Sequence, residues 1–368
     1  MKRRKRKDRS GKVLKMKRQK ESDTDRLSAL PDHLLLHITQ FMTTKHSAQT
    51  SVLSKRWKNL WKCVTNIKLH HLDRYNGVIF DNFVSQFLSG RDNSIPLHSI
   101  SYVNGCMNYP FPPETNIPVE IMEYAVSLTS LTLCLWAINT TSPIMFPKSL
   151  NLPALKTLRL ACFIFFTGDN GYAEPFSTCN MLSKLAIFCC NIQDDAQGLC
   201  ISNSKVSSLA IGTLNPNSNI FKVVVCTPKL TSLTINGSPP AFAAPSSCNL
   251  TLFEELKFNC RYGITMGEDI LISWLHFLAK VKIVTLNFEF LESMINVLEN
   301  NGSLRVQLPS FIKLKSLKVE ADSSISDERV REMVTYLLQN SPPPSTFLIS
   351  KEVDKTCDRC LFFGFLCP

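Results

Sequence analysis

The chain has 368 residues, of which 44% are hydrophobic and 19% charged, so it can bury a sizeable core and form more than one domain. Its formal net charge is +11, but residues 1–20 hold twelve Lys and Arg against the single acid Asp8, and residues 21–368 carry twenty-nine charges of each sign. The neutral body excludes a general electrostatic attraction to phosphates, so a nucleic-acid role would have to rest on this basic arm or on a local patch.

The basic arm opens the chain, and its first 24 residues contain too little apolar surface to fold, so we expect them to be disordered. A nuclear-import signal is the favoured interpretation of its six consecutive basic residues, with nonspecific nucleic-acid contact or a solubilising tail as alternatives. These residues are Lys2, Arg3, Arg4, Lys5, Arg6 and Lys7. The arm has no interleaved aromatic residues for base stacking, which counts against a dedicated nucleic-acid module.

Residues 25–70 have the apolar periodicity of helices. Pro31 suits the first turn of a helix, because its missing N–H would be unpaired there and its φ is already helical. Residues 44–53 predict a short linking helix, and Ser54 is a candidate N-cap for a third helix. The apolar residues expected to share one face of the first or third helix are Leu34, Leu35, Ile38, Phe41, Met42, Trp57, Leu60, Trp61 and Val64. About forty residues cannot bury two such stripes alone, so a partner surface is expected.

The gapless stretch from Asp25 to His70 resembles an F-box, and its Thr50-Ser-Val-Leu-Ser-Lys-Arg-Trp57 string followed by Leu60-Trp61 resembles the plant F-box family in particular. Further matches to plant F-box/leucine-rich-repeat proteins are residues 121–126 and residues 311–340. Together with the repeats described next, the resemblance covers most of residues 25–342.

A second pattern recurs through the rest of the chain. The motif L-x-x-L-x-L, with aliphatic or Phe substitutes at its ends, starts at Leu128, Leu155, Leu182, Val206, Leu230, Phe253, Ile283 and Leu314. Its middle residue is Leu in all eight copies. Side chains alternate across a strand, so each copy predicts a short strand whose anchors point into the core. Stacked copies would form one parallel sheet lining a curved solenoid, which resembles leucine-rich repeats.

The outer layer of this solenoid is expected to contain helices or irregular segments. Two helices are predicted, one with Ile270, Leu271, Trp274, Leu275 and Leu278 on one face, the other with Val330, Met333, Val334, Leu337 and Leu338 behind a cap at Ser326. The predicted fold class is α/β, with a small all-helical N-terminal F-box (25–70), a connecting and capping region (71–127), leucine-rich repeats (128–340) and a C-terminal tail without clear periodicity (341–368).

The sequence predicts neither a catalytic site nor a metal site. Six of the seven His precede the repeats, and there is no P-loop or H-E-x-x-H string. Cys357 and Cys360, with Cys367, would supply only three of the four ligands that structural zinc takes. The fourteen Cys have no framework spacing, and the longest apolar runs are far short of the roughly 20 residues that span a bilayer. We expect reduced thiols in an intracellular protein, no cofactor and no membrane insertion.

The family resemblance implies the substrate receptor of a cullin-RING (Skp-cullin-F-box) ubiquitin ligase, with no bond chemistry of its own. The F-box would bind a Skp-type adaptor, and the repeats would hold an unidentified target protein. The residues carried over as the adaptor-binding and box-core set, which sequence does not divide, are Leu27, Leu30, Pro31, Leu34, Leu35, Ile38, Val52, Leu53, Trp57, Leu60 and Trp61. The outward strand positions are candidates for target binding: Arg159, Phe188, Asn236, Lys257, Asn287, Glu289, Lys318 and Glu320.

Exposed lysines at two of these positions, Lys257 and Lys318, would be replaceable with little effect on the fold. The expected location is the nucleus, with the cytoplasm left open. A small molecule between repeats and target also stays open. The alternatives to a ligase subunit are a nuclear scaffold or nucleic-acid-associated protein that uses the basic arm, and an F-box relic whose repeats have decayed.

Overall fold

The computed structural model describes residues 27, 29–71, 77–106, 127–137, 144–148, 150, 152–213, 222–243, 250–260, 267–301 and 308–352. The basic arm with its predicted import signal, and residues 353–368 with the three tail cysteines, lie outside the described residues. Within the described part, no helix is both long enough and apolar enough to cross a membrane.

The N-terminal helical segment (residues 27 and 29–64) contains α1 (Asp32–Gln40), α2 (Thr44–Gln49) and the 3₁₀ helices η1 (Thr50–Val52) and η2 (Trp57–Cys63). Pro31 precedes α1 as predicted, and the Thr43 hydroxyl caps α2 by accepting a hydrogen bond from His46 N at 3.4 Å. The prediction for the third helix is wrong in two respects. Its geometry is 3₁₀ rather than α, and Ser54 does not cap it, since the N-cap is Arg56.

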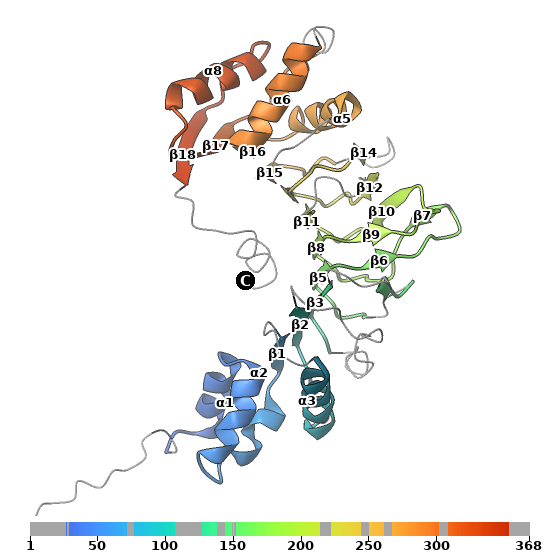
Figure 1. Ribbon diagram of the computed structural model, residues 1–368, viewed down its shortest axis with the longest axis vertical. Coiled ribbons are helices and arrows are strands. Elements are labelled where there is room, and N and C mark those ends of the chain that lie inside the picture. Colours follow the sequence, from blue (N-terminus) through green and yellow to red (C-terminus); the bar gives the residue numbers. More distant parts are fainter. Residues whose placement is uncertain are drawn as a thin grey trace, which may run out of the picture.

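Eleven strands in the described residues form one parallel sheet, stacked along an arc with the N-terminal helical segment at one end (Figure 1). Their order in the sheet follows the chain: β1 (Asn66–His71), β2 (Ser99–Cys106), β3 (Ser130–Ala137), β5 (Thr157–Ala161), β8 (Lys184–Phe188), β11 (Ser208–Gly212), β13 (Ser232–Asn236), β15 (Glu255–Asn259), β16 (Ile283–Asn287), β17 (Ser316–Asp322) and β18 (Thr346–Glu352). This is the predicted solenoid.

Alternation of side chains across each strand builds the core. The middle anchors Leu131, Leu158, Leu185, Leu209, Leu233, Leu256 and Leu317 are all buried, and adjacent anchors are register partners where their strands pair directly. Hydroxyl groups in the turns before the strands add polar links between repeats. Ser207 Oγ donates to Ser183 O at 3.3 Å, and Thr231 Oγ1 donates to Ser207 O at 2.9 Å. Each repeat therefore buries its anchors against its neighbours, and its turn hydroxyl satisfies a turn carbonyl of the repeat before it.

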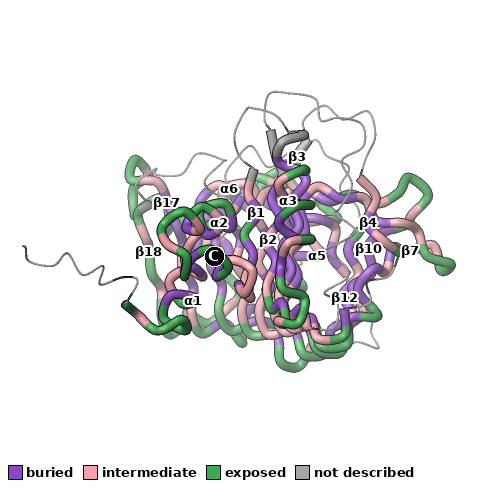
Figure 2. The backbone as a smooth tube through the Cα atoms, turned by 90° about the horizontal axis from the view of Figure 1, so that it is seen from below, coloured by how far each residue is buried: buried purple, intermediate pink, exposed green. Residues whose placement is uncertain are grey.

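The outer layer changes character along the chain. In the middle repeats it consists of short strands in two further parallel sheets, β4 (Met145–Phe146), β6 (Ile164–Phe165) and β9 (Asn191–Ile192), and β7 (Tyr172–Ala173), β10 (Gly198–Ser202), β12 (Val223–Cys226) and β14 (Phe242–Ala243). At the two ends it consists of helices, α3 (Gly77–Gly90), α5 (Glu268–Leu278), α6 (Phe288–Asn300) and α8 (Asp327–Leu337). Figure 2, seen from one end of the arc, shows the buried residues between the sheet and this outer layer. Helices α5 and α8 match the predictions, including the Ser326 cap, whose hydroxyl accepts from Arg329 N at 3.3 Å, whereas α3 and α6 were not predicted.

The repeats extend beyond the predicted range at both ends. Strands β1 and β2 pair in parallel ahead of the first Leu motif, so residues 66–70, predicted as part of the all-helical segment, belong to the sheet instead. Strand β18 lies within the predicted aperiodic tail, where Phe347 pairs with Leu317. The seventh motif is also misplaced by two residues. Val284, not Leu286, aligns with Leu256, and Ile283 is exposed rather than an anchor.

The helical segment is attached firmly to the solenoid. The Trp61 indole packs on Phe87 of α3, with ring centroids 5.0 Å apart. The buried Arg91 side chain donates to Val64 O from Nε at 3.2 Å and from Nη2 at 3.1 Å. A guanidinium buried at a junction is stable only when its donors are satisfied, so these contacts hold the two parts in a defined orientation.

Candidate interaction surfaces

The helical segment has its own small core. Leu35, Trp57 and Leu60 are buried together, and Leu30 and Leu36 pack against them. Leu35 has 0% and Trp57 1% of its surface exposed. These residues cannot present their side chains to a partner while the segment is folded, so the structure removes Leu35, Trp57 and Leu60 from the adaptor-binding set and assigns them to the core.

The 3₁₀ geometry of η2 explains why apolar residues that were predicted to share one face of the third helix point in two directions. Residues three apart eclipse one another in a 3₁₀ helix, so Trp57 and Leu60 face α1 together. Trp61 is then rotated by a third of a turn and reaches the solenoid core instead. An α-helix would have kept all three on one face.

Other apolar residues of the same segment face solvent. Five of the ten large hydrophobic side chains exposed in the described residues lie within residues 27–53. We call these five the apolar surface: Leu27, Leu34, Phe41, Val52 and Leu53. Val52 is 85% exposed and Phe41 77% exposed. Phe41 was missing from the predicted set, although its position seven residues after Leu34 was a signal for it.

The remaining predicted members lie at the margin between core and surface. Pro31 is exposed, and Leu30 and Ile38 are half-buried. Near them, Arg56 Nη2 forms an ion pair with Asp32 Oδ1 at 2.7 Å, which links the start of α1 to the start of η2. The pair is well exposed on both sides, so it positions the two elements more than it stabilises them.

A second surface is the side of the eleven-stranded sheet that faces away from the outer layer, which we call the concave face (Figure 1). Three positions of each strand lie on it, namely those aligned with Ser232, Thr234 and Asn236 of β13. They alternate with the buried anchors, so their side chains point away from the core.

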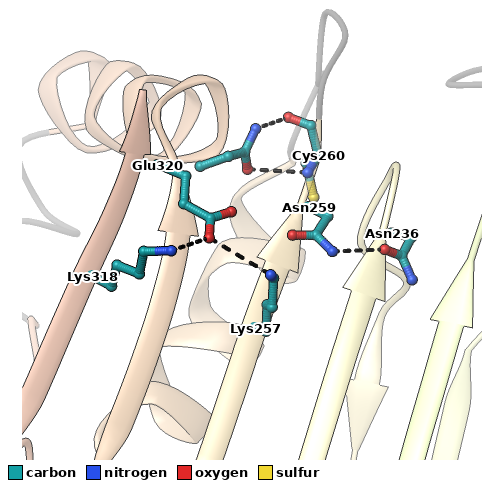
Figure 3. Close-up of polar contacts among 7 residues, drawn as sticks. Asn236, Lys257, Asn259, Cys260, Lys318 and Glu320 are labelled. Carbon is teal, nitrogen blue, oxygen red and sulfur yellow. Dashed lines mark hydrogen bonds and ion pairs between the residues drawn. The ribbon is translucent and has the colours of Figure 1, made fainter. Parts of the chain in front are cut away.

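Near the C-terminal end of the concave face, two lysines hold one carboxylate (Figure 3). Lys318 Nζ lies 2.7 Å and Lys257 Nζ 3.6 Å from Glu320 Oε1. Only 10% of the Glu320 side chain is exposed, against 36% for Lys257 and 39% for Lys318. The expectation that these lysines are freely replaceable is therefore wrong, because removing both would leave a nearly buried carboxylate without a counter-charge.

Side-chain amides occupy the strand ends beside this cluster. Asn259 Nδ2 donates to Asn236 Oδ1 at 3.0 Å (Figure 3). Asn287 is buried, and its amide both accepts from Cys260 N at 3.0 Å and donates to Cys260 O. The Asn287 side chain therefore pairs with the main chain of Cys260, which directly follows strand β15 of the preceding repeat. We correct the assignment of Asn287 from a target contact to a structural contact.

Three other predicted target residues also differ from expectation. Glu289 lies in the first turn of α6 rather than on a strand. Phe188 is buried, and its ring lies so close to Gly212 that a Cβ there would approach it to 2.3 Å. Glu320 is buried between its two lysines. The register leaves Arg159, Asn236, Lys257 and Lys318 as partly exposed concave positions and adds exposed ones at Lys184, Ile283 and Leu348, which sequence reasoning missed.

The cysteines do not form a reactive site in the described residues. The nine cysteines whose side chains the structure describes are free thiols, and no described group of three or more His, Cys, Asp and Glu could hold a metal ion. Burial raises the pKa of Cys179 to about 11 and that of Cys190 to about 12. Such thiols stay protonated at neutral pH and behave as small hydrophobic residues.

Comparison with known proteins finds similarity both in the helical segment, which has the apolar surface, and in the solenoid, which has the concave face. The family model for the F-box domain matches residues 27–68. An F-box protein of Arabidopsis thaliana is 28% identical over 325 residues, which cover 80% of this chain and 78% of the relative. A putative F-box/LRR-repeat protein, also of Arabidopsis thaliana, is 23% identical over 407 residues, covering 88% of this chain and 80% of the relative. An F-box/FBD/LRR-repeat protein of the same species is 49% identical over 67 residues, or 18% of this chain and 14% of the relative.

Proposed function

Because the chain belongs to the plant F-box/leucine-rich-repeat family, we propose that it is the substrate-recognition subunit of a Skp-cullin-F-box ubiquitin ligase. Proteins of this family are in general non-catalytic adaptors in ubiquitin conjugation. In this proposal the apolar surface binds a Skp-type adaptor, and the concave face binds the protein to be ubiquitinated.

The observation that carries the proposal is the apolar surface. A folded segment of about forty residues leaves five large hydrophobic side chains in solvent while burying Leu35, Trp57 and Leu60 as a core of its own. Large exposed apolar side chains concentrated in one segment mark a protein–protein interface, because each loses unfavourable contact with water when a partner covers it.

The attachment of the helical segment supports the second half of the proposal. The contacts of Trp61 and Arg91 hold the solenoid in a defined orientation to the apolar surface. A target on the concave face would then be held at a defined position relative to the adaptor. Such tethering raises the effective concentration of the target's lysines near the ubiquitin-loaded enzyme, and it needs no catalytic group on this chain.

The test is binding of the full-length chain to a purified Skp-type adaptor, measured by calorimetry. We expect binding by the unaltered chain and a severe loss with V52E/L53E, because two carboxylates would be placed against an apolar partner surface. As a matched control, K229E/K313E places two carboxylates on exposed turns of the solenoid and should bind normally. Failure of the unaltered chain to bind any Skp-type adaptor would refute the proposal.

We also propose that the basic arm is a nuclear-import signal, on the basis of its six consecutive Lys and Arg. Deleting residues 2–20 from a fluorescently tagged chain should shift it from nucleus to cytoplasm. Unchanged nuclear accumulation of the shortened chain would refute the proposal that the basic arm directs nuclear import.

A further inference from the structure

The charges of the concave face are biased towards positive. Over the eleven strands, the three concave positions carry five cationic residues, Lys68, Arg159, Lys184, Lys257 and Lys318, against two acidic ones, Glu255 and Glu320. Asp322 adds a third acid at the next position on the same side of β17. Residues 21–368 as a whole carry equal numbers of each sign, so the excess of two positive charges is a local property of this face. It became visible only when the strand register was known.

The exposed part of this charge is more positive still. Glu320 is nearly buried and is neutralised by the two ammonium groups beside it, whereas Lys68 and Lys184 are exposed. A partner approaching the concave face would therefore meet cationic side chains before carboxylates. Charge complementarity of this kind favours an acidic partner and opposes a basic one.

The side-chain amides on the same face favour a partner that presents an extended peptide main chain. After the hydrogen bond between Asn259 Nδ2 and Asn236 Oδ1, no partner of Asn259 Oδ1 or of Asn236 Nδ2 is found among the described residues. This pair offers one acceptor and one donor, which suits a peptide main chain. Lys68 on β1 and Lys318 on β17 lie nine strand spacings apart, or about 43 Å, which an extended segment of roughly thirteen residues would span.

We infer that the concave face recognises an extended acidic segment of the target protein; this rests on the proposed function. A nucleic acid is the less favoured anion for two reasons. The cations are spread singly over many strands, and the two aromatic residues at the three concave positions, His70 and Phe188, are half-buried and buried, so neither offers an open ring on which a base could stack.

The test uses the full-length chain and three fluorescein-labelled peptides of about thirteen residues, a length taken from the span of the strands. One alternates Glu with Ser, one alternates Lys with Ser, and one contains only Ser and Gly. Binding is followed by fluorescence anisotropy at physiological salt. We expect the Glu peptide to bind at least about tenfold more tightly than the uncharged peptide and the Lys peptide to bind worst.

Two variants locate the binding. K68E/K184E reverses two exposed concave lysines and leaves Glu320 with its partners, and it should weaken binding of the Glu peptide about tenfold. K257Q/E320Q/K318Q removes the whole cluster without leaving a buried unpaired charge, and it should also weaken binding. The control K229E/K313E makes the same charge change as K68E/K184E on exposed turns outside the concave positions, and it should bind within about twofold of the unaltered chain. The basic arm is present in every variant, so its own attraction for the Glu peptide cancels when a variant is compared with the unaltered chain, and this comparison is the one that places the binding on the concave face.

Three results would overturn the inference: no preference for the Glu peptide, equal weakening by K229E/K313E and K68E/K184E, or displacement of the Glu peptide from this face by a single-stranded oligonucleotide that binds more tightly. Adaptor binding is measured on the same variants. If adaptor binding persists while the acidic preference fails, only the inference about the target is lost. If the unaltered chain binds no adaptor, the proposed function itself fails.

Discussion

The division of the helical segment into a core and an apolar surface predicts that neighbouring apolar residues have different roles. Val52 and Leu53 are 85% and 58% exposed, whereas Leu35 is 0% exposed. We therefore expect V52A/L53A to leave the free energy of unfolding within about 0.5 kcal/mol of the unaltered chain, as exposed substitutions do. L35A should instead lower it by about 2–5 kcal/mol, because truncation leaves a cavity in a small core.

Adaptor affinity should respond in the opposite order. Full burial of a Val or Leu side chain contributes about 1.5–3 kcal/mol, so covering the exposed parts of Val52 and Leu53 would contribute roughly 3 kcal/mol together. Their truncation should then weaken the adaptor complex about 100-fold. The L35A chain, measured where it is still folded, should lose much less affinity, since its side chain never reaches the partner.

Urea unfolding followed by circular dichroism, together with calorimetric titration of the adaptor, separates the two effects. If V52A/L53A shifted the unfolding transition and L35A did not, the assignment of Leu35 to the core and of Val52 and Leu53 to the apolar surface would be wrong. Equal losses of affinity in both variants, with both fully folded, would also contradict the assignment.

Three further predictions concern the solenoid. Replacing both lysines around Glu320 with Met should lower the free energy of unfolding by about 3–5 kcal/mol, and adding E320Q should recover most of it in urea titrations, because the uncompensated charge is then gone. G237A should lower the melting temperature, since φ is +81° and a Cβ would meet a backbone oxygen at 2.0 Å, whereas G267A has nothing within 4 Å and should not. Because burial raises the pKa of Cys190 to about 12, its thiol should resist iodoacetamide at pH 8 until the chain unfolds. The raised pKa of Cys190 should also make the free energy of unfolding fall as pH rises above about 9, because the unfolded chain releases the thiol proton there and the folded chain keeps it. An unfolding free energy that is flat from pH 8 to 11 would contradict this.

Much of the fold could be predicted from local patterns. Leu131 and Leu233 are buried where the repeat motif put them, because alternation along a strand depends only on positions within that strand. Ser326 caps α8 because a cap needs only the first turn of its own helix. The resemblance of residues 25–70 to an F-box likewise depended on one continuous stretch, and the match to residues 27–68 agrees with it.

Other features depended on elements far apart in the chain. The motif at Ile283 was misplaced by two residues because Val284 and Leu286 satisfy the same pattern, and only pairing with β15 selects between them. Strand β18 has no Leu motif and is specified by its pairing with β17. A shift by two keeps Val284 and Leu286 on the core side of the strand, although it places Ile283 in solvent, so the fold class was right even where the register was wrong.

The sequence by itself determined that the segment before β1 is helical and apolar, that a parallel solenoid follows and that the net charge lies in the first twenty residues. Only the tertiary structure decided that Trp57 is core, that Trp61 joins the solenoid and that Val52 faces solvent, because a 3₁₀ turn and contacts with α1 and α3 select among residues of equal hydrophobicity. It also decided that Lys257 and Lys318 meet at Glu320, on strands whose sequences are sixty residues apart. The periodicity of a sequence predicts which side chains share one face of a helix or strand. Which of these side chains are buried, and which charged groups lie beside them, depends on the other elements that pack against that face.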